Sequence, residues 1–294
     1  MMMRVFLFVA TNLAIMLVIG IVASVFGLQR STGGLGGLLL MSAVIGMTGS
    51  LFSLFISKWL AKRSTGAQVI SQPRNEAEAW LLNTVRRQAD KTGIGMPEVA
   101  VFEAAEMNAF ATGWNRNKSL VAVSTGLLRQ MQRDEVEAVL GHEISHVANG
   151  DMVTLSLLQG VLNTFVVFFS SIVANIVSGA LRGNSNSRPG MIDSVVHTVV
   201  YIVLQMLFGL LASMIVMWFS RRREFRADHG GATLASRNAM INALRRLGGD
   251  RAEHALPEAV QAFGIAGGRT SGLRKLFMSH PPIEERIAAL EAGR

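Results

Sequence analysis

The stretch Gly141-His142-Glu143-Ile144-Ser145-His146 is the part of the chain around which the rest is organised. Two histidines four positions apart share one face of a helix, because a helix turns once in about 3.6 residues. This spacing suits two imidazole ligands of a single zinc ion. Glu143 stands between them, placed to hold a water molecule. The alternative is a surface helix with an unrelated pair of histidines, and the remaining sequence has to decide between the two.

The composition indicates that much of the chain faces lipid. In 294 residues, 50% are hydrophobic, and the mean hydropathy is +0.37; both values favour a membrane protein. The absence of cysteine excludes disulfides, thiolate ligands and cysteine nucleophiles, so a zinc site must be built from histidines and carboxylates. The net charge of +8 comes with lysines and arginines that flank apolar runs. Anionic lipid headgroups explain this pattern better than nucleic acid does.

Four uncharged runs are long enough to cross a bilayer. They cover residues 5–28, 31–57, 152–181 and 194–220, against the roughly 20 residues that a spanning helix needs. A cleaved signal peptide is the competing interpretation of the first run, but the run is longer than a typical signal core and lacks a clear cleavage site. We therefore predict four transmembrane helices, the last two of which form a hairpin.

The charged segment between the second and third runs predicts the first part of a domain in water. Apolar positions at helical spacing predict a helix over residues 75–90. Three short extended runs follow, at residues 98–102, 107–112 and 119–124, separated by turn residues. They predict a small antiparallel sheet, so the expected fold class is an α+β membrane protein whose aqueous domain is mainly helical.

The helix that carries the two histidines has start and stop signals of its own. Asp134 with Glu137 three residues later predicts a capping box, and Asn149-Gly150 predicts the end of the helix. The polar residues around the motif argue against an intramembrane protease, whose site would lie in hydrocarbon. A transporter or a scaffold with a structural metal is the non-enzymatic alternative, but four spans without buried carboxylates offer a transporter little.

The hairpin brings a second acidic segment to the side of the membrane on which the two histidines lie. If both spans cross, the segments before Asp151 and after Ser220 share one side. There Glu224 is our predicted third zinc ligand, and Asp228, one turn on, can accept the free ring N–H of a liganding imidazole, for which we expect His142. Two alternatives stay open: His229 is a rival ligand, and both acids could simply pair with neighbouring arginines on a solvated face.

The distribution of positive charge predicts which side this is. Basic residues flanking the two aqueous segments outnumber those in the opposite loops, which predicts that both segments and both termini are cytoplasmic. The predicted organisation is a pair of transmembrane helices at 1–60, the first part of the aqueous domain at 61–151, the hairpin at 152–220 and the second part of the domain at 221–294.

Several motifs together resemble one known family. The two-histidine motif, Glu224 with Asp228 after a membrane hairpin, the run Asn108-Ala109-Phe110-Ala111-Thr112-Gly113 and the ending Ser279-His280-Pro281-Pro282 are similar to those of the HtpX family of membrane-bound zinc endopeptidases, which is related to the CAAX prenyl proteases. The resemblance covers most of the chain, including the order of spans and aqueous segments. It implies a gluzincin-type protease domain at the cytoplasmic face of a bacterial inner membrane that degrades misfolded or damaged membrane proteins under stress.

The resemblance also implies roles for individual residues. It makes His142, His146 and Glu224 the ligands of one Zn²⁺ per chain, Glu143 the general base and His280 the group that stabilises the oxyanion. An open alternative for His280 is that the following prolines merely start a last helix over residues 283–290.

Three further predictions concern residues 108–112, Arg286 and residues 248–272. Asn108, Ala109, Phe110, Ala111 and Thr112 resemble the edge strand on which metalloproteases lay their substrate, although a plain sheet strand is the alternative. Arg286 on the last helix is expected to orient substrate or to pair with Glu284 or Glu224. The glycine-rich residues 248–272 are expected to form either a flap over the cleft or a passive loop.

Overall fold

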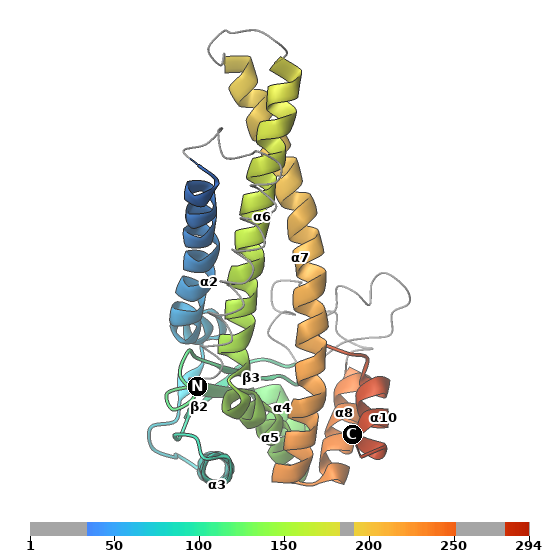
Figure 1. The fold of residues 1–294 in the computed structure, drawn as a ribbon. Helices are drawn as coiled ribbons and strands as arrows, with labels where there is room; N and C mark the ends of the chain where they lie inside the picture. The colour runs from blue at the N-terminus through green and yellow to red at the C-terminus, as the bar shows by residue number, and fades with distance from the viewer. Residues whose placement is uncertain (1–33, 183–190, 251–279, 294) are drawn as a thin grey trace. The chain divides into compact units, whose positions relative to one another are not determined.

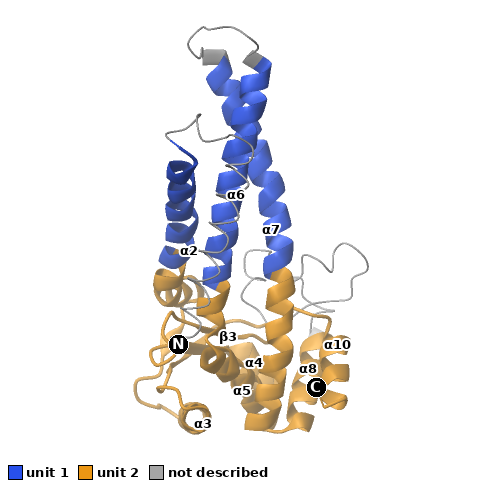
Figure 2. Ribbon diagram, viewed as in Figure 1, with its two compact units in different colours: residues 1–52, 156–216 blue, residues 53–155, 217–294 orange. Residues whose placement is uncertain are grey.

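A computed structural model describes residues 34–182, 191–250 and 280–293. The chain divides into two compact units, the first comprising residues 1–52 and 156–216 and the second comprising residues 53–155 and 217–294 (Figures 1 and 2). The first unit is built from apolar helices, and the second contains the sheet and the two-histidine motif.

Three described helices are long and apolar enough to cross a membrane. They are α2 (Leu35–Thr65), α6 (Asp151–Arg182) and α7 (Met191–Leu234). They coincide with the second, third and fourth predicted spans, whereas the first predicted span, residues 5–28, lies outside the described residues. So does the loop predicted at 248–272, except for its first three residues, which end α8 (Arg237–Asp250). Within the first unit α2 and α6 approach closely, since a Cβ on Gly46 would lie 2.4 Å from the backbone nitrogen of Thr164.

The sheet of the second unit has four strands and is mixed, so the expectation of an antiparallel sheet is wrong in part. The strands are β1 (Gln68–Val69), β2 (Glu98–Phe102), β3 (Ala109–Thr112) and β4 (Leu120–Ser124), in the order β1-β2-β4-β3. β4 pairs antiparallel with β3 but parallel with β2. Every residue of β4 is buried, as is typical of a central strand, and β3 is left at the edge of the sheet.

The helices of the second unit show the end signals that the sequence contains, with one shift. α3 (Glu76–Thr92) begins after Asn75, whose side chain accepts from the backbone N–H of Glu78, and ends at Gly93 with a left-handed φ of 67°. α5 (Arg133–Asn149) carries the motif, and its capping box joins Gln132 to Glu135, two residues earlier than predicted. The cap lies at Gln132 because Glu135 accepts from the backbone N–H of Gln132 at 2.8 Å.

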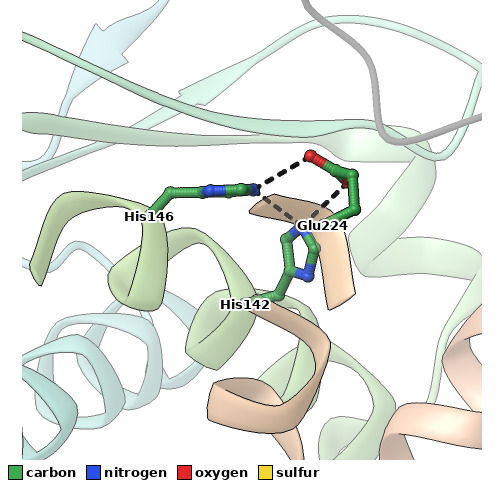
Figure 3. A group of neighbouring side chains, drawn as sticks. All are labelled: His142, His146 and Glu224. Atoms are coloured by element: carbon green, nitrogen blue, oxygen red, sulfur yellow. Dashed lines mark hydrogen bonds and ion pairs between the residues drawn. The ribbon is translucent and has the colours of Figure 1, made fainter. Parts of the chain in front are cut away.

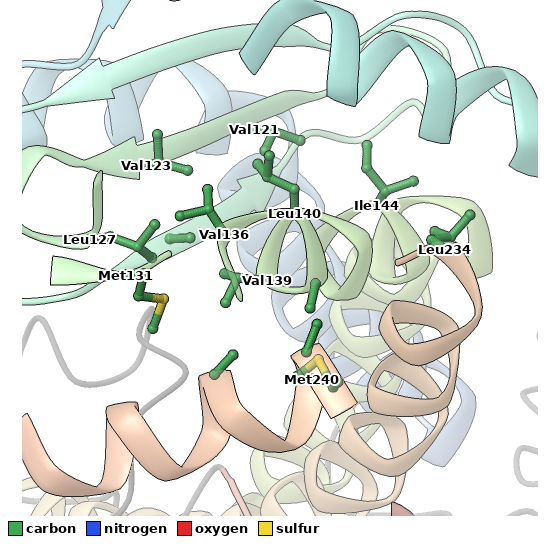
Figure 4. Packing of buried hydrophobic residues seen from close by; sticks show 14 of the residues in the cluster. Val121, Val123, Leu127, Met131, Val136, Val139, Leu140, Ile144, Leu234 and Met240 are labelled. Atoms are coloured by element: carbon green, nitrogen blue, oxygen red, sulfur yellow. The ribbon is translucent and has the colours of Figure 1, made fainter. Parts of the chain in front are cut away.

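One hydrophobic core holds the second unit together. Side chains from the sheet, α3, α5, the end of α7, α8 and α10 (Ile283–Glu291) are buried against one another, as Figure 4 shows for fourteen of them. Among them Leu140 and Ile144 on α5 are fully buried. Their burial fixes how α5 is rotated, and therefore where the histidines on its other face point.

α5 and α7 cross in backbone contact at three glycines. A Cβ on Gly141 would lie 3.1 Å from the Cα of Gly231, and one on Gly231 would lie 2.8 Å from the carbonyl oxygen of Ala138. A Cβ on Gly230 would lie 2.6 Å from the Cβ of Ser145. Real Cβ atoms essentially never approach as closely as those at positions 230 and 231 would, and the contact at Gly141 is tighter than nearly all real ones, so glycines permit this crossing. The crossing brings the acids of α7 beside the histidines of α5.

Candidate metal centre

Three side chains from two helices converge on one point. His142 and His146 come from α5 and Glu224 from α7, and all three side chains are buried. The Nε2 atoms of His142 and His146 lie 3.1 Å apart. The Nε2 atom of His146 is 3.3 Å from Glu224 Oε1, and that of His142 is 3.6 Å from Glu224 Oε2 (Figure 3). Among the described residues this is the group of histidines and acids whose ligand atoms could share a metal ion.

The donor set fits a zinc ion. In both imidazoles the Nδ1 atom faces a carboxylate, so Nδ1 carries the hydrogen and the two Nε2 atoms point lone pairs at each other. Two lone pairs at 3.1 Å repel unless a cation lies between them. The three separations also match the edge of a tetrahedron with bonds of about 2.0–2.1 Å, which is about 3.3 Å long. The carboxylate of Glu224 faces both Nε2 atoms and supplies the anionic oxygen that completes a set of three protein ligands.

Asp228 and Arg286 orient the first histidine. Asp228 Oδ1 accepts from His142 Nδ1 at 2.9 Å, and the guanidinium of Arg286 donates to Asp228 from Nε at 2.7 Å and from Nη2 at 2.5 Å. Burial opposes the charge on Arg286, but Asp228 outweighs it and raises the pKa of the guanidinium. Both residues are buried, at 1% and 0% exposure, so Asp228 is not part of a solvated face.

Asp151, which was not among the predicted site residues, orients the second histidine. Asp151 Oδ2 accepts from His146 Nδ1 at 2.8 Å, and Arg223 Nη1 donates to the backbone oxygen of Asp151 at 3.0 Å. Burial lowers the pKa of His146, but the hydrogen bond to Asp151 and the carboxylate of Glu224 outweigh it and raise that pKa to about 10, so a zinc ion at Nε2 would have to displace a proton. The signal available in the sequence was an acid immediately after the glycine that ends the motif helix.

Glu143 lies between the histidines and next to the edge of the sheet. It is 4% exposed, and burial raises the pKa of its carboxyl, while the two histidines and, more weakly, the nearby backbone of Ala111 in β3 act in the opposite direction. A carboxyl with a raised pKa is suited to accept and return a proton near neutral pH. The contact also shows that the edge strand passes beside the candidate base.

Of the remaining predicted residues, His280 lies beside the metal ligands, Asn108 lies next to the edge strand and His229 lies at the surface. His280 Nδ1 lies 2.7 Å from Glu224 Oε2, so His280 belongs to the cluster. Burial lowers the pKa of His280, against the effect of Glu224. Asn108 precedes β3 and is held by Ser124, its backbone N–H donating to Ser124 Oγ at 2.9 Å, while its Oδ1 is buried without a hydrogen bond. His229, the rival ligand, is exposed.

The geometry and the apolar helices together define a membrane protein with the metal centre of a zinc metallopeptidase. The sequence profile described as Peptidase family M48 matches residues 75–294, and the chain belongs to this family. His142, His146 and Glu224 are the zinc site typical of these peptidases.

Individual relatives agree with this assignment. The chain is 59% identical to Protease HtpX of Xanthomonas campestris pv. campestris (strain B100), over 99% of this chain and 97% of that protein. It is 58% identical to Protease HtpX of Xanthomonas oryzae pv. oryzae (strain MAFF 311018), with the same coverage. Its fold is similar to the crystal structure of S. mikatae Ste24p, with a TM-score of 0.60 at 16% identity; the match covers 86% of this chain and 58% of that one.

Proposed function

We propose that this metallopeptidase is a membrane-anchored endopeptidase that cleaves misfolded or damaged membrane proteins, in quality control and stress response. The observation that carries the proposal is the position of buried Glu143 next to the backbone of Ala111 in β3, because it places the candidate base beside the free edge of a sheet. A polypeptide that adds to such an edge is held by backbone hydrogen bonds, which tolerate many side-chain sequences. Tolerance of many sequences suits an enzyme whose substrates are recognised because they are misfolded or damaged, and not by a common sequence motif.

In this proposal Glu143 moves the proton. Zinc at His142, His146 and Glu224 would lower the pKa of a water molecule and polarise the peptide carbonyl. Glu143 accepts the proton of the attacking water and returns it to the leaving amine, a task for which its buried carboxyl and raised pKa are suited. General base catalysis of this kind contributes roughly 10²–10⁴-fold to rate.

The residues around Glu143 orient the ligands and the substrate and stabilise the oxyanion. We assign to His280 the donation of a ring N–H to the developing oxyanion, which its place beside Glu224 supports. Asp228 and Arg286 hold the ring of His142 in one orientation and tautomer. Residues 108–112 receive the substrate strand, with the outward backbone groups of β3 as hydrogen-bond partners.

The proposed location is a bacterial inner membrane, with both termini and the metal centre in the cytoplasm. The excess of lysine and arginine around the aqueous segments supports this orientation. The organisation into transmembrane helices at 1–60, a hairpin at 152–220 and aqueous segments at 61–151 and 221–294 is part of the proposal. Cysteines introduced at positions 66 and 186 test it, since the native chain has none. Labelling of both from the same side would contradict it.

Cleavage assays with matched glutamate variants test the chemistry. Purified protein with one equivalent of zinc is mixed with an unfolded soluble protein or with a destabilised membrane protein. Glu143→Gln should retain zinc and lose turnover by about 10²–10⁴-fold. Glu137→Gln, on the same helix but paired with Arg87 at 2.6 Å, should retain both. Full turnover by Glu143→Gln would remove the proposed base, and absence of cleavage by the wild type would favour the scaffold alternative.

A further inference from the structure

The tip of the β3–β4 hairpin, residues 113–118, belongs to the second unit and has no role in the proposed catalysis. It reads Gly-Trp-Asn-Arg-Asn-Lys. Trp114 is 45% exposed, and Arg116 and Lys118 are exposed as well. An exposed tryptophan beside two exposed cations, at the end of an edge strand, is not explained by the core of the unit.

The hairpin tip is held against α2. The rings of Phe55 and Trp114 have centroids 5.5 Å apart. Lys58, one turn further along α2, donates from Nζ to the backbone oxygen of Lys118 at 3.0 Å. The ring contact and the hydrogen bond fix the tip at the level of residues 55–58 of that helix.

This is the level at which α2 changes from apolar to basic. Residues 31–57 carry no charge, and Lys58 and Lys62 follow. Phe52, Phe55 and Trp59 are 63%, 57% and 63% exposed, as lipid-facing side chains are in the absence of lipid. An apolar stretch that ends in aromatic and then basic residues marks the boundary between hydrocarbon and headgroups.

The same signature recurs on α7. Trp218 is 52% exposed, and the guanidinium of Arg222 lies 4.9 Å above its ring, where the uncharged run of that helix ends. By contrast, the ring of Trp80 on α3 faces Arg133 among the charged residues of the aqueous segment. Trp80 therefore serves as a reference for a tryptophan that does not contact lipid.

We propose that residues 113–118 dock into the headgroup layer of an anionic bilayer, with the Trp114 ring at the acyl boundary and Arg116 and Lys118 toward lipid phosphates. Lys58 and Lys62 pair with Glu98, at 2.8 and 2.5 Å, so the charge offered to lipid comes from the tip itself. Phe55 and Lys58 are about 4.5 Å apart along the helix axis. That distance fits within a headgroup layer of about 5–8 Å.

Docking of the tip would also determine the direction from which a substrate reaches β3. This inference rests on the proposed function. Trp114 follows Ala111 by three residues, or about 10 Å of extended chain. A polypeptide paired with β3 therefore has one end at the bilayer surface. The edge strand is placed to receive segments that emerge from the membrane, rather than chains that approach from bulk water.

Depth-dependent fluorescence quenching tests the docking. The chain has four tryptophans, so two single-tryptophan proteins are compared in nanodiscs containing brominated phosphatidylglycerol: one keeps Trp114 and the other keeps Trp80, with phenylalanine elsewhere. Zinc stoichiometry confirms folding of each. We expect shallow bromines to quench Trp114 several times more than Trp80. Equal quenching, together with full access of aqueous iodide to Trp114, would overturn the proposal.

A comparison of substrates tests the consequence separately. Trp114→Ser combined with Arg116→Ser should lower cleavage of a membrane-embedded substrate severalfold relative to an unfolded soluble one. If the wild type cleaves neither substrate, the proposed function fails. If the wild type cleaves both and the variant lowers both equally, the inference about membrane delivery fails while the proposed function stands.

Discussion

Replacing Gly230 with alanine is expected to weaken zinc binding, although Gly230 touches no ligand. The new Cβ would lie 2.0 Å from Ser145 Oγ and 2.6 Å from Ser145 Cβ. The hydroxyl can rotate away, but the Cβ cannot, so the two helices must separate by about 1 Å to restore an ordinary contact. Catalytic and metal sites tolerate displacements of about 0.5 Å.

The magnitude follows from where Gly230 lies on α7. Asp228 is two residues away and Glu224 six, or about 9 Å along the axis, so a shift at Gly230 moves both. Disturbing the partner of a liganding histidine typically costs 10–100-fold in metal affinity. We expect the zinc Kd to rise by that factor, and the overpacked crossing to lower the free energy of unfolding by about 1–3 kcal/mol.

A compensating substitution separates this geometry from a general loss of stability. Ser145→Gly removes both clashing atoms and leaves Cα at 4.0 Å, an ordinary contact. Alone it should cost about 1 kcal/mol in helix stability. Combined with Gly230→Ala it should restore zinc affinity to within severalfold of the wild type, measured by competition with a chromophoric chelator. Wild-type affinity in Gly230→Ala, or a double variant no better than the two single effects added, would refute the reasoning.

Three further predictions concern the cluster itself. Asp151→Asn should weaken zinc binding about 10–100-fold, whereas Asp134→Asn at the exposed start of α5 should not; equal affinities by chelator competition would remove Asp151 from the site. Glu224→Ala should lose stoichiometric zinc, measured by mass spectrometry of the metal, because two imidazoles remain where a catalytic zinc needs three protein ligands. Arg286→Lys should lower stability by a few kcal/mol, since one ammonium cannot replace two hydrogen bonds to buried Asp228; an unchanged melting temperature would contradict this.

Local sequence signals predicted much of the fold and of the metal site. The spacing of His142 and His146 is a property of one helix, and the ends of α3 at Asn75 and Gly93 follow from side-chain and backbone rules that act within a turn. Glu224 required one longer step, the return of a membrane hairpin. The resulting placement of Glu224 beside the histidines is confirmed, because uncharged runs of some 30 residues restrict the path of the chain.

Relations through space were harder to predict. Three extended runs in sequence order favour neighbours that pair as hairpins, yet β4 inserts between β2 and β3, and only the burial of the whole strand distinguishes it as central. Asp151 was missed for a related reason. It opens the next helix after a left-handed turn at Gly150 with a φ of 66°, and its partner His146 lies five residues back on another element. No periodic pattern crosses such a turn.

The two carboxylates that orient the imidazoles come from helices other than the one that carries the histidines. His142 of α5 donates to Asp228 of α7, and His146 of α5 donates to Asp151, the first residue of α6. α6 and α7 are also two of the three described helices with membrane-spanning length and composition. Rotation of either helix end about its axis would therefore turn an imidazole away from the common point that Glu224 completes. Zinc affinity in this protein consequently depends on how the adjoining ends of α6 and α7 are packed against the motif helix, and not on the motif alone.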